Sequence, residues 1–381
     1  MDSALPSNRG STMADYTQQA RSIHSSLPVI DGHNDLPWAL RIRADSNLDA
    51  ADPCQPLAGY HTDVPRLAVG GVGAQFWSVF VPAWDPTPFR TTIEQIDLVQ
   101  RMTDRCGRLA RADSAEDVVT ARELGKTASL MGAEGGHAIE NSLAALRTLR
   151  RLGVRYMTLT HGDTIDWADS ATDEPRHGGL TDFGEDVVRE MNRIGMMVDI
   201  SHVSADTMRH ALSVSDRPVM ASHSSAFAIA PHPRNVPDDV LAMVQANDGV
   251  VMVNFYPPFV NRDAAEQAKG KFDVARRLMA ELGDDAAVEA ELARMLEENP
   301  YPEVAISEIV DHIEYVANAA GVRHVGLGSD YDGVDTTPVG LEDVACYPAI
   351  TVELLRRGWP EPDIRAALGE NALRVLAAND E

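Results

Sequence analysis

Histidine and carboxylate side chains suited to binding metal ions occur at intervals through the 381-residue chain. The strongest candidates are His33, Asp35, Glu134, His202 and His223. Imidazole nitrogens and carboxylate oxygens without a thiolate are a donor set that suits Zn²⁺, with Co²⁺ or Mn²⁺ as substitutes. His33 and Asp35 are two residues apart, so on a strand both side chains would project to the same side. These residue types predict a metal centre, and hydrolysis is a chemistry that such a centre supports.

Glu134 has the properties of a ligand shared by two ions. Glycines lie on both sides of it within residues 132–136, and glycines let the backbone come close to a metal or ligand. A carboxylate can bridge two cations a few Å apart, although a glutamate here could instead stabilise the start of a helix. With the bridge, we expect two Zn²⁺ per chain, each with a position open to water. One ion would be held by His33, Asp35 and Glu134, and the other by Glu134, His202 and His223.

A repeated alternation of strand and helix patterns would bring these residues together. Segments with helical periodicity, such as 93–110, 138–153 and 306–321, separate the expected strands. Alternating strands and helices predict parallel strands, and eight units suggest a closed (β/α)₈ barrel. Eight short apolar runs are the expected strands: 26–35, 71–81, 126–136, 154–163, 195–204, 217–225, 248–257 and 323–333.

The polar residues cluster at the C-terminal ends of these runs, where (β/α)₈ enzymes have their active sites. An open doubly wound sheet is the alternative, but no Gly-x-Gly-x-x-Gly pattern follows the first run. The sequence therefore favours a barrel with one site assembled from many strands.

The expected domain organisation is a polar N-terminal tail over 1–25 and a single barrel domain over 26–381. Two segments exceed a minimal barrel: 38–70 after the first strand, and the acidic, Ala-rich helical segment 261–301 after the seventh. Both should emerge on the active-site face. They would form a lid, a dimer contact or a surface decoration.

Composition excludes several classes of function. The chain has 33 Lys+Arg against 58 Asp+Glu, a net charge of −25 that would repel nucleic acid and anionic membranes. We see neither a secretory signal nor an apolar run of transmembrane length. The three cysteines, Cys54, Cys106 and Cys346, are few and widely spaced, so we expect no disulfide framework and a reducing cytoplasm.

Several segments form a series whose order is informative: VIDGHNDLPW, EGGHAI, YMTLTHGDTIDWADS, GMMVDISHVS, ASHSSA, RNVPDDVL, VNFYP and HVGLGSDYDGV, spanning residues 29 to about 335. This series resembles the membrane (renal) dipeptidase family, the binuclear-zinc peptidases among the amidohydrolase-like barrels. The resemblance places the five candidate ligands on the metal-binding positions of the family. It implies hydrolysis of free dipeptides, including those with a C-terminal D-residue, by attack of a metal-bridging hydroxide.

The resemblance also implies roles for residues beyond the metal ligands. His161 falls on the histidine that contacts the scissile carbonyl, and Arg234 on the residue that holds the substrate carboxylate. Asp330 falls on the acid/base aspartate, with Asp332 as the reserve for that role. Tyr256 is a candidate wall of the substrate pocket.

Trp38 and Phe255 are further candidate pocket walls, although ordinary packing explains them equally well. The family expectation is a homodimer. The chain departs from the animal members by lacking their signal, lipid-anchor tail and disulfide cysteines, which is typical of a soluble bacterial relative.

Two other functions stay open at this point. A related barrel could hydrolyse an N-acyl amino acid or a cyclic imide, but such barrels often bridge their metals with a carboxylated lysine. The only lysine near the third strand, Lys126, lies at the wrong end of it. A catalytically silent small-molecule binder would have lost a ligand or the acid/base residue, and none is lost here.

Overall fold

The structure is a computed structural model that describes residues 12–380. A closed ring of parallel strands forms its centre, because β1 pairs with β9 and β2 pairs with β4. The (β/α)₈ barrel predicted from the sequence is therefore confirmed, and each predicted strand contains one strand of the ring. The ring consists of β1 (Val29–Asn34), β2 (Val72–Phe80), β4 (Thr127–Glu134), β5 (Val154–Thr158), β6 (Met197–Asp199), β7 (Met220–Ala221), β8 (Val250–Val253) and β9 (Val325–Leu327).

An additional strand, β3 (Leu109–Arg111), was not predicted. It pairs with the first half of β4, whose second half pairs with β5. The helix expected over 93–110 is α4 (Pro88–Arg105), which ends before this strand. Three residues are too few to show an alternating pattern, so the strand is defined by its pairing with β4 and not by its own sequence.

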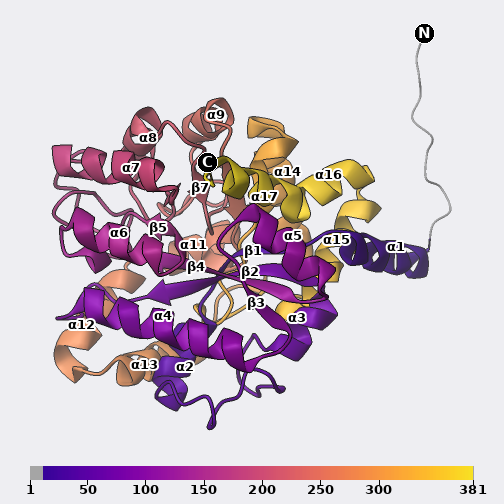
Figure 1. The fold of residues 1–381 in the computed structure, drawn as a ribbon, viewed down its shortest axis with the longest axis horizontal. Coiled ribbons are helices and arrows are strands. Elements are labelled where there is room, and N and C mark those ends of the chain that lie inside the picture. The colour runs from indigo at the N-terminus through magenta and orange to yellow at the C-terminus, as the bar shows by residue number, and fades with distance from the viewer. Residues whose placement is uncertain (1–11, 381) are drawn as a thin grey trace.

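Helices surround the ring (Figure 1). Several begin at a side-chain cap; for example, Ser142 accepts a hydrogen bond from the Ala145 N–H at the start of α6. This cap starts α6 later than the predicted 138–153, because residues 136–139 form a 3₁₀ turn. The surrounding helices are α4, α5 (Ala115–Glu123), α6 (Leu143–Arg151), α7 (Asp182–Ile194), α8 (Ala205–Val214), α9 (Asp238–Ala246), α14 (Ile306–Ala320), α15 (Tyr347–Arg356), α16 (Glu361–Arg365) and α17 (Asn371–Ala378).

The hydrophobic core has two layers. An inner cluster inside the barrel includes Phe76, Tyr156 and Met252, and an outer cluster lies between the strands and the helices. Val375 and Leu376 of α17 join the inner cluster and cover one end of the barrel. Both faces of the strands are buried, which explains an entirely apolar strand such as β8 (VVMV).

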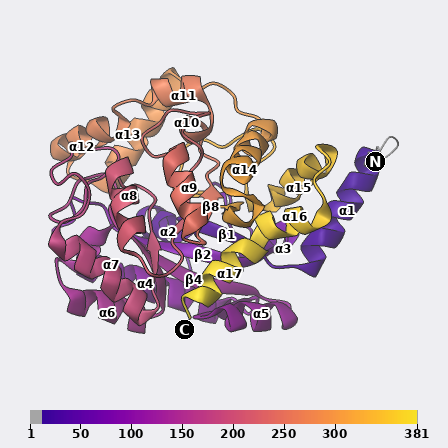
Figure 2. The ribbon, with the colours of Figure 1, turned by 90° about the horizontal axis from the view of Figure 1, so that it is seen from above.

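The N-terminal region contains a helix where a polar tail was expected. Helix α1 (Met13–Ser26) packs against α15, at the edge of the molecule (Figures 1 and 2). Tyr16, Ala20 and Ile23 follow helical spacing and face the protein. This apolar stripe is narrow and lies within an otherwise polar segment, so the sequence pattern did not reveal the helix. Residues 1–11 of the predicted tail lie outside the described residues.

Both predicted insertions contain helices. The first contributes part of α2 (Leu36–Ala44) and all of α3 (Val64–Gly70). The second follows α10 (Pro257–Val260) and contains α11 (Arg262–Gln267), α12 (Lys271–Leu282) and α13 (Asp285–Glu298). Helix α13 contacts α2, so the two insertions meet (Figure 1).

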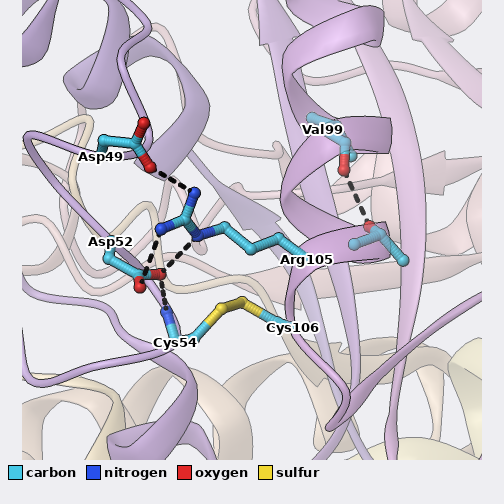
Figure 3. Close-up of a disulfide and its surroundings, with 7 residues drawn as sticks. Asp49, Asp52, Cys54, Val99, Arg105 and Cys106 are labelled. Atoms are coloured by element: carbon cyan, nitrogen blue, oxygen red, sulfur yellow. Dashed lines mark hydrogen bonds and ion pairs between the residues drawn. A yellow bond between two sulfur atoms is a disulfide. The ribbon is translucent and has the colours of Figure 1, made fainter.

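A disulfide joins Cys54 to Cys106, which shows that the expectation of no disulfide was wrong (Figure 3). The two cysteines are 52 residues apart in sequence, but the loop after α2 folds back onto the end of α4. Arg105 holds that loop through ion pairs to Asp49 and Asp52 at 2.7 and 3.2 Å. Sequence spacing gave no sign of this contact, and cysteine usage no longer supports a reducing compartment.

Cys346 is a free, half-buried thiol. Among the described residues, none of the helices has the length and apolarity needed to span a bilayer.

Candidate metal centre

The five predicted ligands converge at the C-terminal ends of the strands. His33 is the penultimate residue of β1, and Asp35 lies between the end of β1 and the start of α2. Glu134 is the last residue of β4, while His202 and His223 follow β6 and β7. All five side chains are buried.

Glu134 lies at the middle of this group. Its Oε1 is 3.0 Å from His202 Nε2 and 3.5 Å from His223 Nε2. Its Oε2 is 3.4 Å from His33 Nε2, which in turn is 3.2 Å from Asp35 Oδ2. Oε1 therefore faces His202 and His223 while Oε2 faces His33, so the carboxylate has histidines on both sides, as a bridging ligand does.

Hydrogen bonds at the far ring nitrogens show which atoms of His33 and His223 face inward as acceptors. The Tyr156 hydroxyl donates to the Gly32 carbonyl, so it accepts from His33 Nδ1 at 2.8 Å. The Ser222 hydroxyl donates to an Asp199 oxygen at 2.6 Å and so accepts from His223 Nδ1 at 2.8 Å. Both imidazoles then present an Nε2 lone pair to the centre, as metal-binding histidines do.

One buried nitrogen at the centre has no hydrogen-bond partner, which fits a bound cation. His33 Nε2 faces two carboxylate oxygens, yet it forms a hydrogen bond with neither. Asp35 Oδ2 and Glu134 Oε2 place negative charge on two sides of this nitrogen. The pocket thus favours positive charge at this point, and its nitrogen and oxygen donors fit Zn²⁺.

Asp330 and Asp332 occupy different surroundings. Asp330 lies in a group with His33 and Asp35 in which ligand atoms are within 4.8 Å of one another. The Asn254 amide donates to Asp330 Oδ2 at 2.8 Å, and burial raises the pKa of this carboxyl. Asp332 instead accepts from the His61 backbone N–H at 2.8 Å. Of these two residues, Asp330 is therefore the one that lies beside the candidate ligands.

His161 forms part of the wall beside the centre. Its ring lies 4.3 Å from the His202 ring and 4.7 Å from the Phe80 ring. Burial lowers the pKa of His161 to about 4, so the ring is neutral at neutral pH. The described residues supply no hydrogen-bond partner for its ring nitrogens, which leaves a donor available to a substrate.

Arg234 is fully buried behind the cavity wall. Its Nη2 donates to the His223 carbonyl at 3.3 Å, and its guanidinium lies 5.1 Å from the Phe259 ring centre. Its Nε is buried without a hydrogen-bond partner. Burial lowers the pKa of Arg234 to about 10, so it remains charged at neutral pH. His232 and Phe259, which contact it, line the cavity, but Arg234 itself does not.

The centre opens into a cavity of about 750 Å³. Tyr256 lines it, and the Tyr256 hydroxyl accepts a hydrogen bond from Lys271 at 2.6 Å. Trp38 also lines it, whereas Phe255 does not and packs against Tyr331 and Tyr347 in the core. Of the three residues predicted to form the pocket wall, Tyr256 and Trp38 line the cavity, and the prediction for Phe255 is wrong.

Sequence reasoning missed the residues that orient the ligands. Tyr156 lies within an apolar strand and gives no polar signal at a strand end. Asn254 follows β8 directly, and its position at a strand end could have identified it. Lys271 and Phe272 come from the second insertion, whose approach to the site depends on tertiary packing.

The family described as membrane dipeptidase (peptidase family M19) matches residues 17–381. The structure of dipeptidase AC, a metallo peptidase of family M19, has 26% identity, covers 93% of this chain and 98% of its own, and gives a TM-score of 0.76.

Two further solved structures are similar. A metallo peptidase from Rhodobacter sphaeroides, liganded with a phosphinate mimic of the dipeptide L-Ala-D-Ala, has 25% identity, a TM-score of 0.75, and coverage of 93% of this chain and 99% of its own. The probable dipeptidase PvdM from Pseudomonas aeruginosa has 23% identity and a TM-score of 0.82, with 96% and 98% coverage, and shows the shared fold.

Proposed function

The chain belongs to the membrane dipeptidase family, peptidase family M19, and is a metal-dependent dipeptidase; we propose that it acts with two Zn²⁺ ions per chain. His33, Asp35 and Glu134 would hold one ion, and Glu134, His202 and His223 the other. The observation that carries this assignment is the position of Glu134, whose two oxygens face different histidine groups. When bound, two such ions supply an activated water and polarise the scissile carbonyl.

Asp330 would move the proton during hydrolysis. It lies beside His33 and Asp35, and the Asn254 amide fixes its orientation. Burial raises its pKa, which suits a carboxyl that takes a proton from the attacking water and delivers it to the leaving amine. His161 would donate a hydrogen bond to the carbonyl oxygen, because its ring is neutral and lies at the cavity wall.

Arg234 would hold the free carboxylate of the dipeptide. Its charge is buried next to the cavity, and a guanidinium suits a carboxylate because its donors form a planar fork. The unpartnered Nε supports a role in binding, and His232 and Phe259 form the cavity wall in front of it. Acceptance of a C-terminal D-residue is supported by the Rhodobacter sphaeroides structure with its L-Ala-D-Ala mimic.

The proposal is tested by assaying metal-depleted protein with and without added Zn²⁺ on L-Ala-L-Ala, L-Ala-D-Ala, tri-Ala and N-acetyl-Ala. We expect cleavage of the two dipeptides only, restored by Zn²⁺ as bound metal rises to two ions per chain. Saturation at one ion would contradict the paired site. Cleavage of only N-acetyl-Ala would assign the chain to another amide substrate, and no turnover with two ions bound would favour a silent binder.

A further inference from the structure

The cavity extends beyond the metal centre into a region that the proposed mechanism does not use. We call this region the outer chamber and define it by Trp38, Phe80, Trp84, Val288 and Leu292. These residues come from α2, the end of β2 and the loop after it, and α13. The outer chamber is therefore closed on one side by the second insertion.

An aromatic wall connects the outer chamber to the metal centre. The rings of Trp38 and Phe80 meet edge to face with centroids 5.0 Å apart. Phe80 then contacts His161 at 4.7 Å, and His161 contacts the ligand His202 at 4.3 Å. A side chain lying against this wall would be next to the scissile bond.

Several charged groups that line the cavity near this wall already have partners. Asp285 accepts a hydrogen bond from the Trp84 indole at 2.9 Å. Arg276 pairs with Asp163, and Lys271 pairs with Asp335. Glu289 and Arg43 also line the cavity: the Trp38 indole bonds to Glu289, and Arg43 donates to the Gly59 carbonyl. The rest of this wall is aromatic and aliphatic.

The order of the strands decides which end of a dipeptide reaches the outer chamber. Phe80 ends β2, whereas His223 and Arg234 follow β7, which lies on the opposite side of the eight-stranded ring. A substrate whose carboxylate lies near Arg234 and whose scissile carbonyl lies at His161 therefore directs its N-terminal residue toward β2.

Building on the proposed function, we infer that the outer chamber is the subsite for the N-terminal side chain, and that the enzyme prefers dipeptides with a large apolar N-terminal residue. The cavity volume of about 750 Å³ is in the range that encloses drug-sized ligands, well beyond the needs of a glycyl dipeptide. Burial of a large apolar side chain contributes roughly 1.5–3 kcal/mol, which corresponds to about a 10- to 100-fold effect.

The test compares kcat/KM for Gly-Ala, Leu-Ala, Phe-Ala, Lys-Ala and Asp-Ala on the Zn²⁺-loaded enzyme. We expect Leu-Ala and Phe-Ala to exceed Gly-Ala by roughly 10- to 100-fold. Equal values, or a preference for Lys-Ala or Asp-Ala, would overturn the inference while leaving the dipeptidase function intact. Failure to cleave any of the five would instead contradict the proposed function.

A pair of variants on α13 distinguishes the effect of filling the outer chamber from the effect of changing the helix in general. Ala293 is an exposed residue that lines the cavity next to Leu292, so Ala293→Phe would add a ring beside the outer chamber. We expect the Phe-Ala to Gly-Ala ratio of kcat/KM to fall about tenfold. The matched control is Met295→Phe, at an exposed position of the same helix outside the cavity lining, which should keep the wild-type ratio. An unchanged ratio in Ala293→Phe would overturn the inference.

Discussion

Asp330 and Asp332 have the same backbone conformation but different neighbours. Both lie in the left-handed region, with φ of 68° and 64°, which costs a non-glycine residue about 1–3 kcal/mol. Gly333 follows closely, and a Cβ at its position would lie 2.2 Å from an Asp35 oxygen. This strained turn presents Asp330 to the metal centre while Asp332 bonds to His61.

The first prediction compares Asp330→Asn with Asp332→Asn. Loss of a general acid/base group lowers the rate by about 10²- to 10⁴-fold, so Asp330→Asn should reduce kcat by that factor with little change in KM. Asp332→Asn should have a much smaller effect, since its carboxylate holds a loop. Steady-state kinetics with measured metal content checks both variants, and an equal loss of kcat in Asp332→Asn would move the acid/base role there.

Helix α14 supports the loop after β7 through a single buried imidazole. The Ala226 N–H donates to His312 Nδ1 at 3.0 Å, and His312 Nε2 donates to the Val260 carbonyl at 2.9 Å. A ring that accepts at one nitrogen and donates at the other is neutral, and burial lowers the pKa of His312. The supported loop carries Arg234, because Ala226 pairs with Val236 on its far side.

The second prediction concerns the pH dependence of stability through His312. Because its folded-state pKa lies below the ordinary value of 6.5, its stabilisation is complete above pH 6.5 and is lost as pH falls through the folded-state pKa. His312→Gln offers one acceptor and one donor but cannot take up a proton. Urea unfolding at pH 7.5 and 5.5 should therefore show a smaller acid loss in the variant, by about 1 kcal/mol.

If the change from pH 7.5 to 5.5 lowers the free energy of unfolding equally in the wild type and in His312→Gln, this role of His312 is contradicted. Burial also lowers the pKa of other histidines, for example His24 and His137, so only the difference between the two proteins is informative.

The disulfide ties together two parts of the molecule that the barrel alone does not connect. The loop holding Cys54 continues to His61, which bonds to Asp332 and lines the cavity. Cys106 lies at the end of α4, on the outside of the ring. The crosslink thus joins a wall of the cavity to an outer helix.

Two properties of the whole molecule, a homodimer and a cytoplasmic location, remain predictions from the sequence.

The third prediction is that Cys54→Ser lowers the free energy of unfolding by up to about 4 kcal/mol, because the disulfide closes a loop of 52 residues and restricts the unfolded chain. Thermal or urea unfolding with and without dithiothreitol measures the effect. Cys346→Ser should unfold like the wild type, since Cys346 is free. Three titratable thiols in the unreduced, unfolded wild type would show that the disulfide does not form.

The sequence alone determined the barrel and the convergence of the five candidate ligands. Parallel strands buried on both faces must be apolar, and a barrel brings the residues at their C-terminal ends together, so His33, Glu134 and His223 could be assigned from their positions. The alternation of strands and helices along the chain follows from local patterns, which a single sequence contains.

The tertiary structure decided what depends on contacts between distant segments. Pairing with β4 defines β3, and folding of one loop onto α4 brings Cys54 to Cys106. The identity of the aspartate at the metal centre depends on a strained turn and on Asn254, which lies 76 residues away in sequence. The outer chamber likewise exists only because α13 packs beside α2, and no local pattern in either helix specifies that contact.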